Sequence, residues 1–63
     1  MNIKNNKLIF ARKSVNYTQQ MVADELKISL RQYQRYENEG KIPNVVLSKK
    51  LAKIFKTSIE SLF

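Results

Sequence analysis

The 63 residues include 12 Lys and Arg but only five Asp and Glu, and the formal net charge of +7 favours polyanionic partners such as nucleic acid. The absence of cysteine and histidine excludes disulfides, thiolate and imidazole catalysis, and the usual zinc sites. Because a chain this short buries only about 60% of the surface that its unfolded form exposes, we expect one domain with no enclosed active site, no enzymatic activity, no cofactor and no metal.

Nearly the whole chain has the pattern of short helices. Its one glycine, Gly40, and its one proline, Pro43, lie close together and mark the main interruption. The first residues, with Asn2, Asn5 and Asn6, indicate a frayed start. A residue able to accept from free backbone N–H groups marks each later helix start, namely Thr18, Ser29, Asn44 and Ser58. We therefore expect an all-α fold of five helices, near residues 5–14, 18–26, 29–38, 44–55 and 58–63.

Apolar residues recur at helical spacing in these segments, which predicts one buried face on each helix. In the third segment this face is formed by Tyr33 and Tyr36. The second and third helices are joined by only a few residues, as in a helix-turn-helix. The other expected core positions are Leu8, Ala11 and Val15, then Val22, Ala23 and Leu26, then Leu47 or Ser48 with Leu51, Ala52 and Phe55, and finally Ile59, Leu62 and Phe63.

The side of the third helix opposite the tyrosines is polar and cationic. It carries Arg31, Gln34, Arg35 and Asn38, flanked by Leu30 and Gln32. Arg31 and Arg35 repel each other, and a cation in the first turn opposes the helix dipole by roughly 0.3–1 kcal/mol. Since Arg can form two hydrogen bonds with guanine and Gln two with adenine, this face is a candidate reader of the DNA major groove. The alternatives are a solvated polar face and a net charge that only aids solubility.

Several short segments have the order and spacing of a known family. They are Ala11-Arg12, Tyr17-Thr18-Gln19-Gln20, Val22-Ala23, Ile28-Ser29, Tyr36-Glu37, Pro43, Leu51-Ala52-Lys53 and Ser58-Ile59-Glu60-Ser61-Leu62. On these segments the chain resembles the phage-repressor and Cro-like (XRE-type) helix-turn-helix family of bacteria and their phages. The resemblance implies a compact lambda-repressor-like domain that binds double-stranded DNA as a sequence-specific transcriptional regulator.

The resemblance also implies roles for individual residues. Thr18 would cap the second helix, and Gln19 would bind a phosphate and brace the reading helix. The positions that face base edges would be Leu30, Arg31, Gln32 and Arg35, with Gln34 at the margin and Ser29 in the adjoining turn. The backbone contacts after the reading helix would come from Asn38, Lys41 and Asn44. Phosphate contacts position such a domain, and base contacts specify the site.

Arg12 and Glu37 match a pair that often forms a salt bridge between the first and third helices of this family. The alternative is two unrelated surface charges. We expect the bridge, because each residue lies next to an apolar core position. Its role would be to fix the angle of the reading helix rather than to add much stability.

Three positions depart from the family pattern. Lys27 occupies a turn position where the family usually has glycine, so it either adopts positive φ at a cost of about 1 kcal/mol or the turn is wound differently. Gly40 lies one place later than usual, so the resemblance does not predict the conformation of the loop after the third helix. Phe10 replaces a residue that is usually charged and, beside Ile9, is a candidate contact patch, although isolated surface aromatics are common.

We expect a homodimer on DNA, because family dimers recognise palindromes. With the chain ending soon after the last helix, the interface would use Ile59, Leu62 and Phe63 or the Phe10 patch. The competing function is a protein-interaction module of the same fold, such as an antitoxin or antirepressor partner, which would not need Arg31 and Arg35. The longest apolar runs have three residues, so we expect no membrane span or signal peptide and a cytoplasmic, nucleoid-associated protein.

Overall fold

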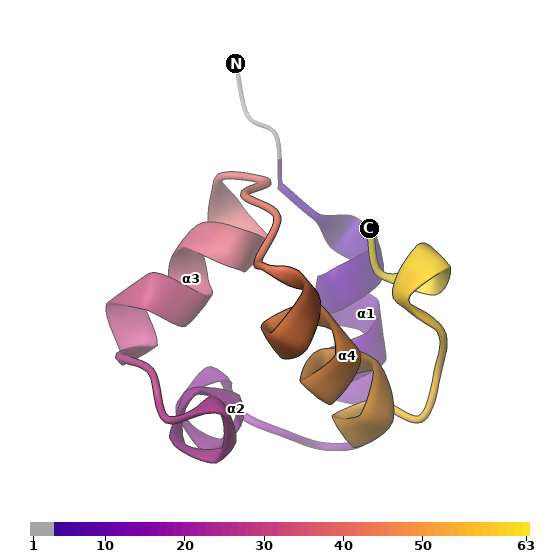
Figure 1. The fold of residues 1–63 in the computed structure, drawn as a ribbon. Helices are drawn as coiled ribbons and strands as arrows, with labels where there is room; N and C mark the ends of the chain where they lie inside the picture. Colours follow the sequence, from indigo (N-terminus) through magenta and orange to yellow (C-terminus); the bar gives the residue numbers. More distant parts are fainter. Residues whose placement is uncertain (1–3) are drawn as a thin grey trace.

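The computed structural model describes residues 4–63 and consists of short helices around one buried core (Figure 1). The helices are α1 (Asn6–Ser14), α2 (Gln19–Leu26), α3 (Leu30–Asn38) and α4 (Val45–Ile54), followed by a 3-10 turn, η1 (Ile59–Ser61). Residues 4–63 contain no strand. The expected all-helical fold is therefore confirmed, but the expected number of five helices is wrong, because the last segment forms only a single turn.

The C-terminal segment forms a single capped turn. Ser58 caps the turn, its Oγ accepting from the Ser61 backbone N at 3.3 Å. Leu62 is the C-cap of the turn, keeps right-handed helical backbone angles, and is fully buried in the core. A segment this short gains few hydrogen bonds to offset its ordering entropy, which disfavours a regular α-helix here.

Each α-helix begins directly after a side chain that accepts from its first turn. Thr18, Ser29 and Asn44 are the N-caps of α2, α3 and α4, and accept from the backbone N of Met21, Gln32 and Leu47. All have extended backbone angles, so each helix proper starts one residue later than the cap. Such a cap is worth about 1 kcal/mol relative to alanine.

Asn5 is the N-cap of α1, which contradicts the expectation of a frayed start at this residue. Its side-chain oxygen accepts from the Leu8 backbone N at 3.0 Å, and its Nδ2 donates to the Leu62 carbonyl at 2.7 Å. The backbone N of Asn5 also donates to the Glu37 carbonyl at 2.8 Å. The start of α1 is thus tied to α3 and to the C-terminal segment, and Asn6 is the first residue of the helix, while Asn2 lies outside the described residues.

The core forms where the apolar faces of all four α-helices meet. Tyr33 and Tyr36 both belong to it, with ring centroids 6.3 Å apart in an edge-to-face arrangement. Of the two alternatives at the start of α4, Ser48 is the buried one, and its hydroxyl donates to the Pro43 carbonyl at 3.2 Å. The remaining buried apolar residues are Leu8, Val22, Ala23, Leu26, Leu51, Ala52, Phe55 and Leu62, with Ala11, Val15, Leu47, Ile59 and Phe63 packed against them half-buried.

Lys27 closes α2 in the left-handed conformation, with φ 58° and ψ 42°. The Ile28 backbone N donates to the Ala23 carbonyl at 3.0 Å, as in the usual glycine-terminated helix end. Of the two expected alternatives, Lys27 therefore adopts positive φ. In Figure 1, α2 is seen nearly end-on while α3 runs across the view, so the two helices cross steeply.

The loop after α3 uses Gly40 for its change of direction. The helix ends at Asn38, Glu39 is its C-cap, and Gly40 has a φ of 66°. The Lys41 backbone N donates to the Arg35 carbonyl at 3.4 Å. The later glycine thus provides the left-handed residue that turns the chain toward α4.

Neither a membrane span nor a metal cluster occurs among residues 4–63. No helix there combines the length and the apolar character needed to cross a bilayer. The same residues contain no group of three metal-ligating side chains.

Candidate nucleic-acid interface

The outward face of α3 is formed by the polar side chains opposite Tyr33 and Tyr36. Arg31 and Asn38 are exposed, whereas Leu30, Gln32, Gln34 and Arg35 are half-buried. A shallow hollow of about 200 Å³ on this face is lined by Arg31, Gln34, Arg35, Asn38 and Glu39. The structure therefore brings four of the expected DNA-facing residues together around one depression.

The two arginines of α3 have no anionic partner among residues 4–63, where Arg12–Glu37 is the one ion pair. They lie one turn apart on the same helix and repel each other. Glu39 lines the same hollow, yet it forms no ion pair with either arginine within the described residues. Within residues 4–63, no ion pair therefore neutralises the two arginines of this face.

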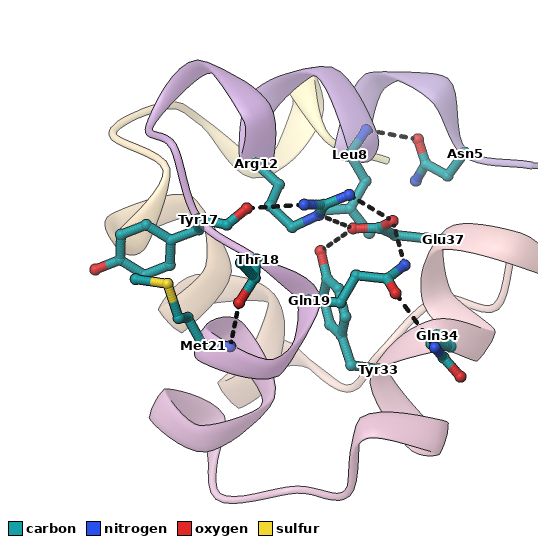
Figure 2. Close-up of polar contacts among 10 residues, drawn as sticks. All are labelled: Asn5, Leu8, Arg12, Tyr17, Thr18, Gln19, Met21, Tyr33, Gln34 and Glu37. Atoms are coloured by element: carbon teal, nitrogen blue, oxygen red, sulfur yellow. Dashed lines mark hydrogen bonds and ion pairs between the residues drawn. The ribbon is translucent and has the colours of Figure 1, made fainter.

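Behind this face, the carboxylate of Glu37 is buried and receives hydrogen bonds from three helices (Figure 2). Arg12 of α1 pairs with it, Nε lying 2.7 Å from Oε2. The Tyr33 hydroxyl donates to Oε2, and Gln19 Nε2 donates to Oε1 at 2.9 Å. Burial and the neighbouring Glu37 carboxylate raise the pKa of Tyr33 well above its ordinary value, so this hydroxyl remains a donor. Glu37 therefore holds α1, α2 and α3 in fixed relative positions.

Gln19 links this buried network to the outward face. Its Nε2 donates to Glu37, and its Oε1 accepts from Gln34 Nε2 at 3.2 Å (Figure 2). Gln19 thus braces α3 through two side chains. Sequence reasoning did not identify these partners, although Gln34 and Glu37 lie one helical turn apart and so share a side of α3.

Gln32 and Leu30 differ from the arginines in their surroundings. Gln32 Nε2 donates to the Tyr36 hydroxyl at 3.2 Å, which turns this amide toward the flank of the core. Leu30 opens α3 and is half-buried. Both residues border the outward face rather than line its hollow.

The remaining candidate contacts are capping residues and one lysine, all of them exposed. Thr18 and Ser29 accept from backbone N–H groups and retain a hydroxyl hydrogen that can be donated to a phosphate. Asn44 accepts through Oδ1 at 2.9 Å, which leaves its amide N–H groups available. Lys41 lies in the loop beside Arg35. Capping therefore does not exhaust the donors of these side chains.

Comparison with known proteins identifies this arrangement. A family model described as "Helix-turn-helix" matches residues 8–62, nearly the whole chain. The chain belongs to the phage repressor/Cro-like helix-turn-helix family. The family is one of DNA-binding transcription regulators and is generally not one of enzymes.

One curated relative within this helix-turn-helix family is the cryptic phage CTXphi transcriptional repressor RstR of Vibrio cholerae serotype O1. The two sequences are 39% identical over 62 residues, an alignment that covers 98% of this chain and 54% of the relative. The chain therefore spans about half the length of the curated relative that it matches. No solved structure matches the chain.

Proposed function

We propose that the protein is a sequence-specific transcriptional regulator that binds double-stranded DNA and reads the major groove with α3. The observation that carries this proposal is the outward pair of arginines, which have no anionic partner among residues 4–63 in a chain of net charge +7. The repressor name of the Vibrio cholerae relative supports regulation by repression.

In this proposal, α3 supplies base contacts and its surroundings supply phosphate contacts. Arg31 and Arg35 face the bases, where Arg can donate two hydrogen bonds to guanine O6 and N7. Leu30, Gln32 and Gln34 border them. The phosphate contacts come from Thr18, Gln19, Ser29, Asn38, Lys41 and Asn44.

We further propose that two copies bind a palindromic operator. The domain measures 29 × 23 × 23 Å, and two half-sites of an operator lie one DNA turn apart, roughly 34 Å. One copy is too short to contact both half-sites, so a palindrome requires two copies. Leu62 is fully buried and is not available to a partner, contrary to its place in the expected interface. Phe10 is 74% exposed and shares a groove of about 310 Å³ with Phe55 and Ser61, so the proposed dimer surface joins α1 to the C-terminal segment.

The dependence of binding on salt tests this function. We expect affinity for a labelled duplex, measured by fluorescence anisotropy, to fall on the order of a thousandfold between 50 and 200 mM salt. Counterion release from several phosphates causes this loss, whereas binding to a protein partner through an apolar surface would change little. Salt-independent binding would contradict the proposal and favour the protein-interaction module.

The matched control is a variant in which Arg31 and Arg35 are both replaced by glutamine. This variant should retain the fold, because neither guanidinium forms an ion pair within residues 4–63. It should bind more weakly and with a smaller salt dependence, since fewer phosphates or base edges are engaged.

A further inference from the structure

We propose that Gln34 recognises an exocyclic amino group on a base edge, that of adenine N6 or cytosine N4, through its side-chain carbonyl oxygen. A glutamine that is free to turn its amide accepts from an amino group or donates to a carbonyl group equally well. In this chain a series of hydrogen bonds beginning at Glu37 fixes which end of the Gln34 amide faces outward. The inference rests on the proposed DNA-binding function and deepens it by naming a specificity-determining residue.

The first step is the hydrogen-bonding role of the Glu37 carboxylate. Its carboxylate can only accept, and it already receives Arg12 Nε at 2.7 Å and the Tyr33 hydroxyl. Gln19 must therefore turn its nitrogen toward Glu37, and Gln19 Nε2 lies 2.9 Å from Oε1. Rotating the Gln19 amide by half a turn would place its oxygen against the carboxylate oxygen, so this orientation is fixed.

In the second step, the fixed orientation of the Gln19 amide sets the orientation of the Gln34 amide at the surface. With its nitrogen on Glu37, Gln19 presents its oxygen to Gln34, and Gln34 Nε2 donates to it at 3.2 Å. The Gln34 carbonyl oxygen then has no partner among residues 4–63, and Gln34 lines the outward hollow with Arg31, Arg35 and Asn38. Turning the Gln34 amide over would break one hydrogen bond and bring two oxygens together.

The third step is the match to DNA. Every base pair shows one amino group in the major groove, adenine N6 or cytosine N4, and one carbonyl group on the opposite strand. An outward acceptor therefore distinguishes the strand on which the amino group lies. The arginines cannot recognise the amino group, because a guanidinium only donates hydrogen bonds. They recognise the carbonyl group of the base pair instead.

Selection of bound duplexes from random DNA provides the first test. For the wild-type chain we expect one position in each half-site where adenine or cytosine on one strand is favoured about 5- to 100-fold over guanine or thymine. Gln34→Ala should lose the preference at that position alone. Gln19→Ala, which releases the Gln34 amide, should lose the preference at the same position, because the freed amide accepts from an amino group or donates to a carbonyl group equally well.

Gln20→Ala is the matched control. Gln20 neighbours Gln19 on α2 but is exposed and bonds only Asp24, at 2.8 Å, within the described residues. Its replacement should leave the selected motif unchanged. Circular dichroism of each variant verifies that the helices are retained, and Gln34→Ala tests the inference independently if Gln19→Ala loses stability.

Base analogues then separate the two amino groups. In the selected site, adenine is replaced by purine, which lacks the N6 amino group, or cytosine by 2-pyrimidinone, which lacks the N4 amino group. The wild-type chain should lose about 5- to 100-fold in affinity on the relevant analogue, whereas Gln34→Ala should lose nothing further. The arm that shows the loss identifies the base.

The outcomes separate this inference from the proposed function. A wild-type motif that Gln34→Ala leaves intact would overturn the role of Gln34 and leave DNA reading in place. So would a preference at the affected position that does not separate amino from carbonyl bases, such as purine over pyrimidine. Equal sensitivity of both proteins to the analogues would overturn it as well. A wild-type chain that enriches no sequence would overturn the proposed function together with the inference.

Discussion

Arg12 Nε lies 2.7 Å from Glu37 Oε2, and this ion pair joins α1 to α3 with side chains only 11% and 1% exposed. Arg12 also donates from Nη1 to the Tyr17 carbonyl at 2.8 Å, so the same guanidinium holds the chain between α1 and α2. None of these contacts belongs to the outward face of α3. The pair therefore acts on the position of α3 rather than on a ligand.

Replacing Arg12 with alanine should destabilise the fold by about 3 kcal/mol, because a buried carboxylate then loses its counter-charge. For a domain of this size we expect a fall in melting temperature of about 10–20 °C, followed by circular dichroism. Lys13→Ala, at an exposed neighbouring position, serves as the control and should change the melting temperature little. An Arg12→Ala protein with the same melting temperature as the wild type would rule out a structural role for the pair.

Replacing Lys27 with glycine should stabilise the protein by about 0.5–1 kcal/mol. Lys27 has a φ of 58°, where a side chain is disfavoured, and glycine relieves this strain despite its greater freedom in the unfolded chain. Lys49→Gly is the matched comparison, because Lys49 lies exposed inside α4, where glycine costs about 1 kcal/mol. Urea unfolding of the two variants should shift the midpoint in opposite directions, and shifts of the same sign would contradict the strain argument.

Stability should decrease as the pH rises above 10, because burial and Glu37 raise the pKa of Tyr33 in the folded state. The unfolded tyrosine ionises near its ordinary pKa of 10.0, while the folded one keeps its proton. Proton release thus favours unfolding, by up to about 1.4 kcal/mol for each pH unit. Urea unfolding at pH 8 and pH 11 should show a smaller decrease for Tyr33→Phe than for the wild type, and equal decreases would count against the raised pKa.

Arg31 and Lys41 should differ in what they contribute to DNA binding. We expect Arg31→Ala to cost about 1–3 kcal/mol on the selected site and to weaken the preference at one base pair. Lys41→Ala should weaken binding to specific and random duplexes alike, since a phosphate contact carries no sequence information. Binding titrations with both duplexes decide between these outcomes, and equal losses on both duplexes for both variants would refute the assignment of Arg31 as a base reader.

The features that sequence could predict are those set by neighbours in the chain. Thr18, Ser29 and Asn44 cap the helices that follow them because the accepted N–H group lies only three residues away. The tyrosine face of α3 follows from helical spacing alone. The outward arginines are opposite that face for the same reason.

The features that sequence could not predict depend on contacts between distant segments. Asn5 becomes an ordered cap partly because its amide reaches Leu62, 57 residues away. The same residue, Leu62, is fully buried in the core, and the segment around it forms a 3-10 turn in place of the expected last helix. The orientation of Gln19 depends on Glu37, a charged residue whose burial has no local signature.

The outward residues of α3 differ in how freely they can be exchanged. Arg31, Arg35 and Asn38 form no ion pair or side-chain hydrogen bond within residues 4–63, so substitutions there could alter the recognised sequence with little effect on folding. Gln34 is joined through Gln19 to the buried Glu37. New binding preferences are therefore expected to arise, in evolution or by engineering, through the free positions, while the base contact that we propose for Gln34 persists across the resulting variants.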